Sequence, residues 1–248
     1  MKLAEMTWPD VDRALTAGCA VLLPTGSTEQ HGPIGRIGTD TLCAEAVALD
    51  AAARCGGIVA PALAYTPAPF NTGFAGTVSL SEETFAALAR EVIQGLLAQG
   101  FTGVFVVNGH GANLAPLAGV QAQVPPGRMQ VMSWWEPEPV QDLRKTLYGA
   151  WEGMHATPSE VSITEHLLGA LPHEPAAHPP EALSAEYIAA HAGDRHGPPD
   201  AHRAQFPDGR VGSHSALAHP DHGDALLTAA GDGIGAAFVA FQREAGAL

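Results

Sequence analysis

Basic residues and cysteines are both scarce in this chain of 248 residues. Lysine and arginine together number 12, against 26 aspartates and glutamates, which gives a formal net charge of −14 at pH 7. A chain this acidic has no electrostatic basis for binding nucleic acid or an anionic membrane surface, so we expect neither partner. The three cysteines, Cys19, Cys43 and Cys55, include no C-x-x-C pair. This argues against a disulfide framework and against a cysteine zinc site.

Long apolar segments are lacking as well. No run of about 18 apolar residues predicts a membrane span, and Asp10, Asp12 and Arg13 interrupt the apolar stretch that a secretory signal needs. We therefore expect no membrane association and a cytoplasmic location. Charged residues make up 15% of the chain and hydrophobic residues 46%, which favours a folded domain over a disordered acidic tail. The length suits a single domain over residues 1–248.

Short apolar runs alternate with longer helical patterns in the first two thirds of the chain. The pattern predicts strands near residues 20–23, 58–60, 101–107 and 129–135, and helices over 41–54, 81–99, 160–171 and 224–244. This alternation is typical of an α/β domain with a mostly parallel central sheet, in which ligands bind at the carboxyl ends of the strands. The segment 172–220 is different, because it is rich in Pro, His, Gly and Asp. We interpret it as a loop-rich excursion over the active face or at a subunit contact.

Histidine is abundant, with 12 residues in the chain, whereas lysine is rare. Glu29 and His31 lie two residues apart in a loop bounded by glycine and proline, so both can point to the same side of an extended segment. Asp40 begins the next predicted helix, and its carboxylate can reach back. Carboxylate and imidazole ligands together suit Zn²⁺, Mn²⁺ or Fe²⁺. The alternative is that Glu29 and His31 are surface loop residues and that Asp40 only caps the helix.

Two more polar clusters follow later in the chain. His110 lies between glycines directly after the third predicted strand, where the backbone can approach a ligand closely; the alternative is a tight turn whose histidine packs. His155 precedes a predicted helix and can act as a general acid or base near neutral pH. Glu160 lies in the first turn of that helix, where an acid is also ordinary. The three clusters together are stronger support for a metal site than any one of them.

These motifs, in this order, resemble those of the creatininase (creatinine amidohydrolase) family. The resemblance rests on E-Q-H-G-P at residues 29–33, G-T-D at 38–40, N-G-H-G at 108–111, and His155 with E-x-S at 160–162. The stretch G-F-A-G-T-V-S-L at 73–80 is similar to a further family motif. The resemblance implies a three-layer α/β/α domain with two divalent metal ions per subunit, Zn²⁺ or Mn²⁺ or Fe²⁺, at the carboxyl edge of the sheet. It also implies a homo-oligomer, such as a hexamer.

The resemblance also assigns roles to individual residues. Glu29, His31, Asp40 and His110 match metal ligands, with Asp40 in the bridging position. Glu160 matches an acid that is a further ligand, and it joins His155, which matches a proton-transferring histidine, as a catalytic residue. Substrate binding is assigned to Ser27, Trp135 and Trp151; for the tryptophans the alternative is core packing next to a strand end.

The chain departs from enzymes that hydrolyse creatinine at the second cluster. Those enzymes resemble G-H-Y-E-N there, with the glutamate binding metal, whereas this chain has Gly111 and Ala112. Glu160 must then supply the acid. The implied function is hydrolysis of the C–N bond of a small, creatinine-like cyclic amide or amide by a metal-activated hydroxide. The alternatives are a deformylase or ring-opening hydrolase of another small substrate in the same family, and a non-catalytic metal-binding protein.

Overall fold

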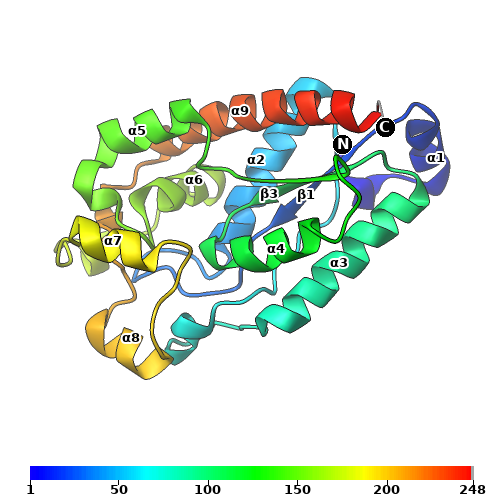
Figure 1. Cartoon of the computed structure of the whole chain (residues 1–248). Coiled ribbons are helices and arrows are strands. Elements are labelled where there is room, and N and C mark those ends of the chain that lie inside the picture. Colours follow the sequence, from blue (N-terminus) through cyan, green and yellow to red (C-terminus); the bar gives the residue numbers. More distant parts are fainter. Residues whose placement is uncertain (247–248) are drawn as a thin grey trace.

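Four short strands form the central sheet of the computed structural model, which describes residues 1–246 (Figure 1). They are β1 (Val21–Thr25), β2 (Ile58–Val59), β3 (Val104–Asn108) and β4 (Met129–Ser133). All pairs are parallel, and the order across the sheet is β2-β1-β3-β4. Every residue of β1 and β3 is buried, as expected for central strands that helices cover on both faces. The predicted α/β class with a parallel sheet is confirmed.

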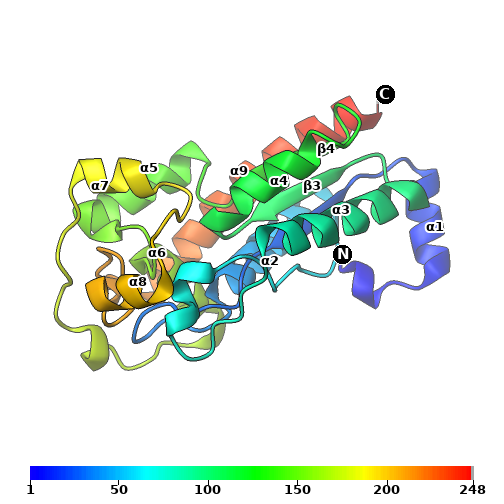
Figure 2. The ribbon, with the colours of Figure 1, turned by 60° about the horizontal axis from the view of Figure 1, so that its bottom comes forward.

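Helices cover both faces of the sheet, which gives three layers (Figures 1 and 2). Leu22 and Phe105 pack on one face with α2, α5, α6 and α9, whereas Leu23 and Val106 pack on the other face with α1, α3 and α4. The alternation follows from the two-residue repeat of a strand, which sends successive side chains to opposite faces. The helices are α1 (Trp8–Thr16), α2 (Thr39–Cys55), α3 (Glu82–Gln99), α4 (Leu114–Gln121), α5 (Glu138–Tyr148), α6 (Pro158–Leu168) and α9 (Pro220–Gly246).

The strand order creates a crevice at the centre of the sheet. From β1 the chain passes through α2 to β2 on one side, whereas β3 lies on the other side of β1. The segments that leave β1 and β3 therefore separate at the carboxyl ends of these neighbouring strands. Such a switch point is where open parallel sheets bind their ligands. Both the loop carrying Glu29 and the loop carrying His110 begin there.

The segment 172–220 contains two short helices, α7 (Ala185–His191) and α8 (Pro199–Gln205), connected by irregular chain. They lie at the left of Figure 1, away from both termini. The segment reaches the carboxyl edge of the sheet, because the Asp194 carboxylate accepts a hydrogen bond from the backbone of Ala112, just beyond β3. It thus forms part of the wall around the crevice.

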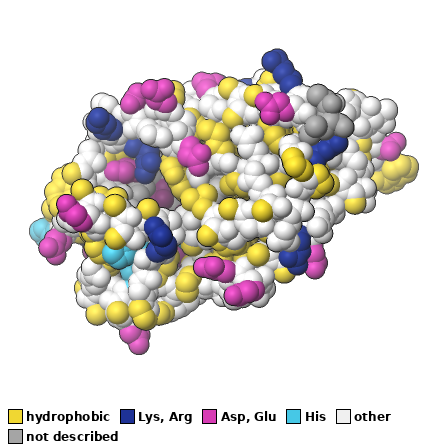
Figure 3. All heavy atoms as spheres, viewed as in Figure 1, with side chains coloured by type: hydrophobic (Ala, Val, Ile, Leu, Met, Phe, Trp, Pro, Cys, Tyr) yellow, Lys and Arg dark blue, Asp and Glu magenta, His cyan; other side chains and the backbone are white. Residues whose placement is uncertain are grey.

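Helix α9 is long and apolar enough, by length and composition alone, to cross a membrane. In the fold, however, it packs lengthwise against α2 and α6 and buries Leu226, Ile234 and Phe238 in the core. This is the arrangement of a central core helix. On the face drawn in Figure 3, Lys and Arg side chains are scattered among Asp and Glu and form no continuous basic patch.

Candidate metal centre

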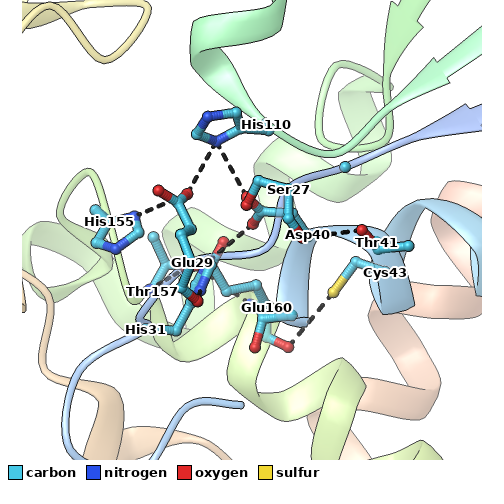
Figure 4. Close-up of polar contacts among 12 residues, drawn as sticks. Ser27, Glu29, His31, Asp40, Thr41, Cys43, His110, His155, Thr157 and Glu160 are labelled. Carbon is cyan, nitrogen blue, oxygen red and sulfur yellow. Dashed lines mark hydrogen bonds and ion pairs between the residues drawn. The ribbon is translucent and has the colours of Figure 1, made fainter. Parts of the chain in front are cut away.

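Five ionisable side chains meet at the crevice between β1 and β3 (Figure 4). Glu29 and His31 come from the loop after β1, Asp40 from the first turn of α2, His110 from the segment after β3, and Glu160 from the first turn of α6. All five are at most 9% exposed. These are the five residues assigned to metal from the sequence, and the fold brings them together.

Close backbone packing brings Asp40 to the end of β3. A Cβ atom added at Gly109 would lie 2.3 Å from the carbonyl oxygen of Asp40. Only glycine therefore lets the chain leaving β3 pass this close to the start of α2. The result is that His110, the next residue, lies beside the Asp40 side chain.

The tautomer of His110 is fixed by its surroundings. Its Nε2 lies 2.7 Å from the carbonyl oxygen of Pro67, which can only accept, so Nε2 carries the proton. In the neutral ring, Nδ1 then holds a lone pair. This atom lies 3.0 Å from a carboxylate oxygen of Glu29 and 3.0 Å from one of Asp40, as Figure 4 shows. A lone pair that faces two carboxylates requires a proton or a cation between them.

His31 repeats this arrangement with its ring reversed. Its Nδ1 lies 3.1 Å from the backbone carbonyl of Glu29, so Nδ1 donates and Nε2 is left with the lone pair. Nε2 lies 2.8 Å from Oδ1 of Asp40 and 3.9 Å from Oε1 of Glu160. A histidine that donates one ring N–H to a backbone carbonyl and turns its other nitrogen toward carboxylates has the environment of a metal ligand.

Asp40 lies between the two histidines. Its Oδ1 faces His31 and its Oδ2 faces His110, so one carboxylate serves two neighbouring groups of ligands. Oδ2 also accepts a hydrogen bond of 2.7 Å from the Ser27 hydroxyl. Two sets of possible ligand atoms share Asp40, and within each set the atoms lie within 4.8 Å of one another. The sets are Glu29, Asp40 and His110, and His31, Asp40 and Glu160.

The electrostatics of the cluster are those of a site built for positive charge. Burial opposes a charge on His31, but the carboxylates of Asp40 and Glu160 outweigh burial and raise the pKa of His31 to about 10. Burial likewise opposes the charge on His110, yet Glu29 and Asp40 hold its pKa well above the usual range. Burial also disfavours the charged form of Asp40, but the two histidines keep its pKa well below the usual range. Without metal the imidazoles hold protons; divalent cations fit the same positions, and the nitrogen and oxygen donors suit Zn²⁺ or Mn²⁺.

Glu160 combines two tasks at the start of α6. Its Oε1 accepts a hydrogen bond of 2.6 Å from the backbone N–H of Thr157, and the Thr157 hydroxyl accepts from the Glu160 N–H at 3.3 Å. This reciprocal capping box starts the helix and fixes the carboxylate in place. Burial raises the pKa of Glu160 to about 8 against the opposing effect of His31.

His155 lies beside the cluster, and its ring centroid is 4.6 Å from that of His31. Its Nε2 lies 2.8 Å from the carbonyl oxygen of Gln30, which accepts, and 3.0 and 3.1 Å from the side-chain amide nitrogens of Gln30 and Asn71, which donate. The neutral ring can therefore carry its proton on either nitrogen. Nδ1 lies 3.9 Å from a carboxylate oxygen of Glu29. Burial lowers the pKa of His155 to about 4, although Glu29 acts in the other direction. The ring is thus neutral at pH 7, with a free nitrogen that can accept a proton.

A cavity of about 230 Å³ opens onto this cluster. Asp40, His110, His155 and Glu160 line it together with Trp134, Trp135, Arg144 and Met154. Two of the residues assigned to substrate binding lie elsewhere. Trp151 packs edge-on against His214, with centroids 5.9 Å apart, and is not among the lining residues described. Ser27 is fully buried and donates to Asp40, so it supports a carboxylate of the cluster.

Two residues of the site carried no signal in the sequence. Asn71 donates a hydrogen bond of 2.8 Å to Oε2 of Glu29 from a 3-10 helix. Asp194 lines the cavity, and its Oδ2 lies 3.7 Å from Nδ1 of His110. Burial raises the pKa of Asp194 to about 6 against the effect of His110. Neither residue follows a strand or belongs to a periodic pattern that would have marked it.

Comparison with known proteins identifies the family. The family model for creatininase, described as creatinine amidohydrolase, matches residues 4–238. The chain belongs to the creatininase family. The creatinine amidohydrolase of Pseudomonas putida is 28% identical over 204 residues, which cover 72% of this chain and 78% of that protein. The family model and this relative are both described as creatinine amidohydrolase, and this chain is a hydrolase acting on C–N amide bonds.

Other members of the family have different activities. The mycofactocin precursor peptide peptidase of Mycolicibacterium smegmatis is 42% identical over 109 residues, 41% of this chain and 43% of that protein. The 3-dehydro-scyllo-inosose hydrolase of Thermotoga maritima is 34% identical over 107 residues, 43% of this chain and 34% of that protein. A solved creatinine amidohydrolase structure shares the fold, with a TM-score of 0.73 and 24% identity over 95% of both chains. The family therefore fixes hydrolysis as the reaction and leaves the substrate open.

Proposed function

We propose that this protein is a metal-dependent amidohydrolase that cleaves the C–N bond of a small amide or cyclic amide. Glu29, Asp40 and His110 would hold one divalent ion, and His31, Asp40 and Glu160 a second. The observation that carries the proposal is the shared carboxylate of Asp40, whose two oxygens face the lone-pair nitrogens of two buried histidines. Zn²⁺ and Mn²⁺ both suit this mixture of nitrogen and oxygen donors.

Divalent ions in such a site would lower the pKa of a bound water and polarise the carbonyl group of the substrate. The chain's own contribution to proton transfer falls to His155. Its ring is neutral, and in the tautomer whose Nε2–H donates to the carbonyl of Gln30, Nδ1 is free and faces Glu29. The ring can therefore accept the proton of the attacking water at Nδ1 and return it to the leaving nitrogen. The hydrogen bond from the backbone N–H of Thr157 keeps the Glu160 carboxylate in place during the reaction.

The cavity favours a small substrate. Its volume of about 230 Å³ and its walls of Trp134, Trp135 and Met154 would enclose a compact, partly apolar molecule. Creatinine is one candidate, because a creatinine amidohydrolase is a relative over most of this chain. The alternative substrate is a formamide or another small cyclic compound. This chain has Gly111 and Ala112 at the positions of the Tyr and Glu in the G-H-Y-E-N motif of creatinine-hydrolysing enzymes.

Elemental analysis of the purified protein, with His31→Ala and Asp40→Ala variants, tests the metal assignment. We expect His31→Ala to lose one ion and Asp40→Ala to lose both, because Asp40 belongs to both sets of ligands. Full metal occupancy in both variants would exclude this centre. A hydrolysis panel of creatinine, other lactams and formamides then tests turnover; a metal-loaded protein that hydrolyses none of them would support the non-catalytic alternative. A cytoplasmic location and a homo-oligomeric assembly stay predictions.

A further inference from the structure

One basic side chain, other than the histidines, lines the cavity above the proposed metal centre. Within residues 1–246, the lining contains a single Lys or Arg, which is Arg144 from α5. Trp134, Trp135 and Met154 line the same cavity. A guanidinium group in a cavity that tryptophans also line, in a chain with only 12 Lys and Arg residues, is unusual enough to need a reason.

The guanidinium group is held by one side only. Its Nε donates a hydrogen bond of 2.8 Å to Oε1 of Glu152, which is 9% exposed and also accepts from the Ser159 hydroxyl. No other hydrogen bond from Arg144 occurs among the described residues. Arg has five N–H donors, so the four N–H groups on its two terminal nitrogens remain for a ligand or for water. Glu152 thus fixes the orientation of the group without occupying its terminal nitrogens.

We propose that Arg144 binds a carboxylate group of the substrate. The proposal rests on the proposed amidohydrolase function, and it narrows the substrate class to small amides that carry a carboxylate, such as N-acyl amino acids or short peptides. The paired terminal nitrogens of a guanidinium match the two oxygens of a carboxylate, and charge-assisted bonds of this kind are the strong ones. Three acids line the cavity. Asp40 and Glu160 are assigned to the metal ions, and the Asp194 carboxylate accepts from the backbone N–H of Ala112 beside His110, so none of the three pairs with Arg144.

The shape of the cavity supports this assignment. The metal ligands Asp40, His110 and Glu160 and the cation Arg144 line one continuous space, and its apolar lining residues include Trp135 and Leu114. A substrate can therefore place its amide at the ions and its carboxylate at Arg144, with an apolar linker along the tryptophan. Creatinine has no carboxylate group and would leave Arg144 unused.

Matched ligand pairs test the proposal. Each pair consists of an N-formyl amino acid and the N-formyl amino alcohol of the same length: N-formylglycine with N-formylethanolamine, N-formyl-β-alanine with N-formyl-3-aminopropanol, and the next longer pair. Calorimetry on the metal-loaded protein gives Kd for each member, and KM replaces Kd for any member that is hydrolysed. We expect the carboxylate to bind about tenfold to a hundredfold more tightly than the alcohol for at least one length.

The variant Arg144→Gln should abolish this preference and leave binding of the alcohol unchanged. Lys145→Gln is the control, because Lys145 is exposed on the same helix and its substitution makes the same change in charge. A role of Arg144 in structure alone would weaken both members of a pair equally. If loss of the partner of Glu152 unfolds the protein, the double variant Arg144→Gln/Glu152→Gln removes both charges together.

The outcomes separate this inference from the proposed function. A carboxylate preference that survives in Arg144→Gln, or equal binding of both members of every pair by the wild type, overturns the inference. Formate release is followed in parallel and reports on turnover. Hydrolysis without any carboxylate preference would support the amidohydrolase function and exclude carboxylate binding by Arg144. An Arg144-dependent preference without hydrolysis would support carboxylate binding by Arg144 and count against the amidohydrolase function.

Discussion

The carboxylate of Asp194 occupies the space that a side chain on Gly111 would need. A Cβ atom added at Gly111 would lie 2.3 Å from Oδ2 of Asp194. The same oxygen accepts a hydrogen bond from Ala112 and approaches His110. Asp194 itself has φ +55, in the left-handed region that non-glycine residues seldom adopt. The absence of a side chain at 111 thus lets a residue of the 172–220 segment reach the metal centre.

Substitution of Gly111 by Ala should displace Asp194 from the centre. We expect Gly111→Ala to cost about 1–3 kcal/mol of stability, because the new methyl group overlaps a held carboxylate. Hydrogen exchange in residues 192–197 should become faster, since their contact with the sheet edge is lost. Gly119→Ala is the control, because Gly119 lies within α4 and a Cβ atom added there would meet nothing within 4 Å. Unchanged exchange in 192–197 for Gly111→Ala would contradict this account.

The stability of the metal-free protein should fall as the pH rises from 7 to 10. The pKa of His31 is about 10 in the folded state and about 6.5 in an unfolded chain, so the folded state binds the proton more tightly. The stabilisation is therefore complete below about pH 6.5 and is lost as the pH rises through about 10. Thermal unfolding followed across this range measures the effect. Only Lys2 and Lys145 could add a lysine titration.

Metal loading should remove this pH dependence between pH 7 and 10, because ions replace the protons on His31 and His110. The difference in Tm between loaded and metal-free protein should thus widen with pH. A metal-free protein whose Tm stays constant to pH 10 would show that the carboxylates do not hold the protons as described.

The parallel sheet and most of the metal site could be predicted from the sequence. Both β1 and β3 are apolar up to their last residues, Thr25 and Asn108, and the polar clusters with Glu29 and His110 follow shortly after. Because carboxyl ends of neighbouring parallel strands meet at one edge, adjacency in the chain was enough to bring these residues together. The resemblance to the family supplied the assignment of individual residues as metal ligands, with Asp40 as the bridging one. In the structure Asp40 lies between the two histidines.

Helices α4 and α5 were not predicted from the sequence. Helix α5 carries Pro139 and α4 carries Pro116, and proline near the start of a helix is tolerated, because the first N–H groups have no partner within the helix. The failure to predict α5 matters, because this helix carries Arg144.

Side chains of the 172–220 segment could not be placed from the sequence either. Asp194 reaches the centre through an irregular turn with two successive positive φ angles, at Gly193 and at Asp194. No periodicity marks such a turn. The tryptophans show the same limit: Trp135 lines the cavity and Trp151 packs on His214, and nothing local in their sequences distinguishes these two environments.

Asn71 should control the affinity of the first proposed ion without touching it. Its amide donates to Oε2 of Glu29 and is fully buried, so it fixes the direction of that carboxylate. Partners of ligands typically contribute about 10–100-fold to metal affinity. We expect Asn71→Ala to weaken one ion by about this factor and to spare the ion at His31. Metal titration in competition with a chelator measures both. Thr72→Ala, at the exposed neighbour, should leave both affinities unchanged, and so would Asn71→Ala if the bond to Glu29 were incidental.

The two functions of Glu160 can be separated by a pair of substitutions at the start of α6. Gln at 160 retains the capping box, since Gln also serves at this position, but removes the carboxylate charge that faces His31. We expect Glu160→Gln to lose the second ion with little change in the stability of the metal-free protein. Thr157→Ala removes the cap and should cost about 1 kcal/mol of stability while both ions still bind.

Chemical denaturation of metal-free protein and elemental analysis of loaded protein give the two readouts for each variant. The expected pattern is crossed, because each variant changes one readout and preserves the other. Glu160 lies 3.9 Å from Nε2 of His31, so an ion between them needs only a small movement of the carboxylate, which the capping bond to Thr157 already positions. If Glu160→Gln retained both ions, then Glu160 would be a helix cap alone, and the second ion would have to rest on His31 and Asp40 with water.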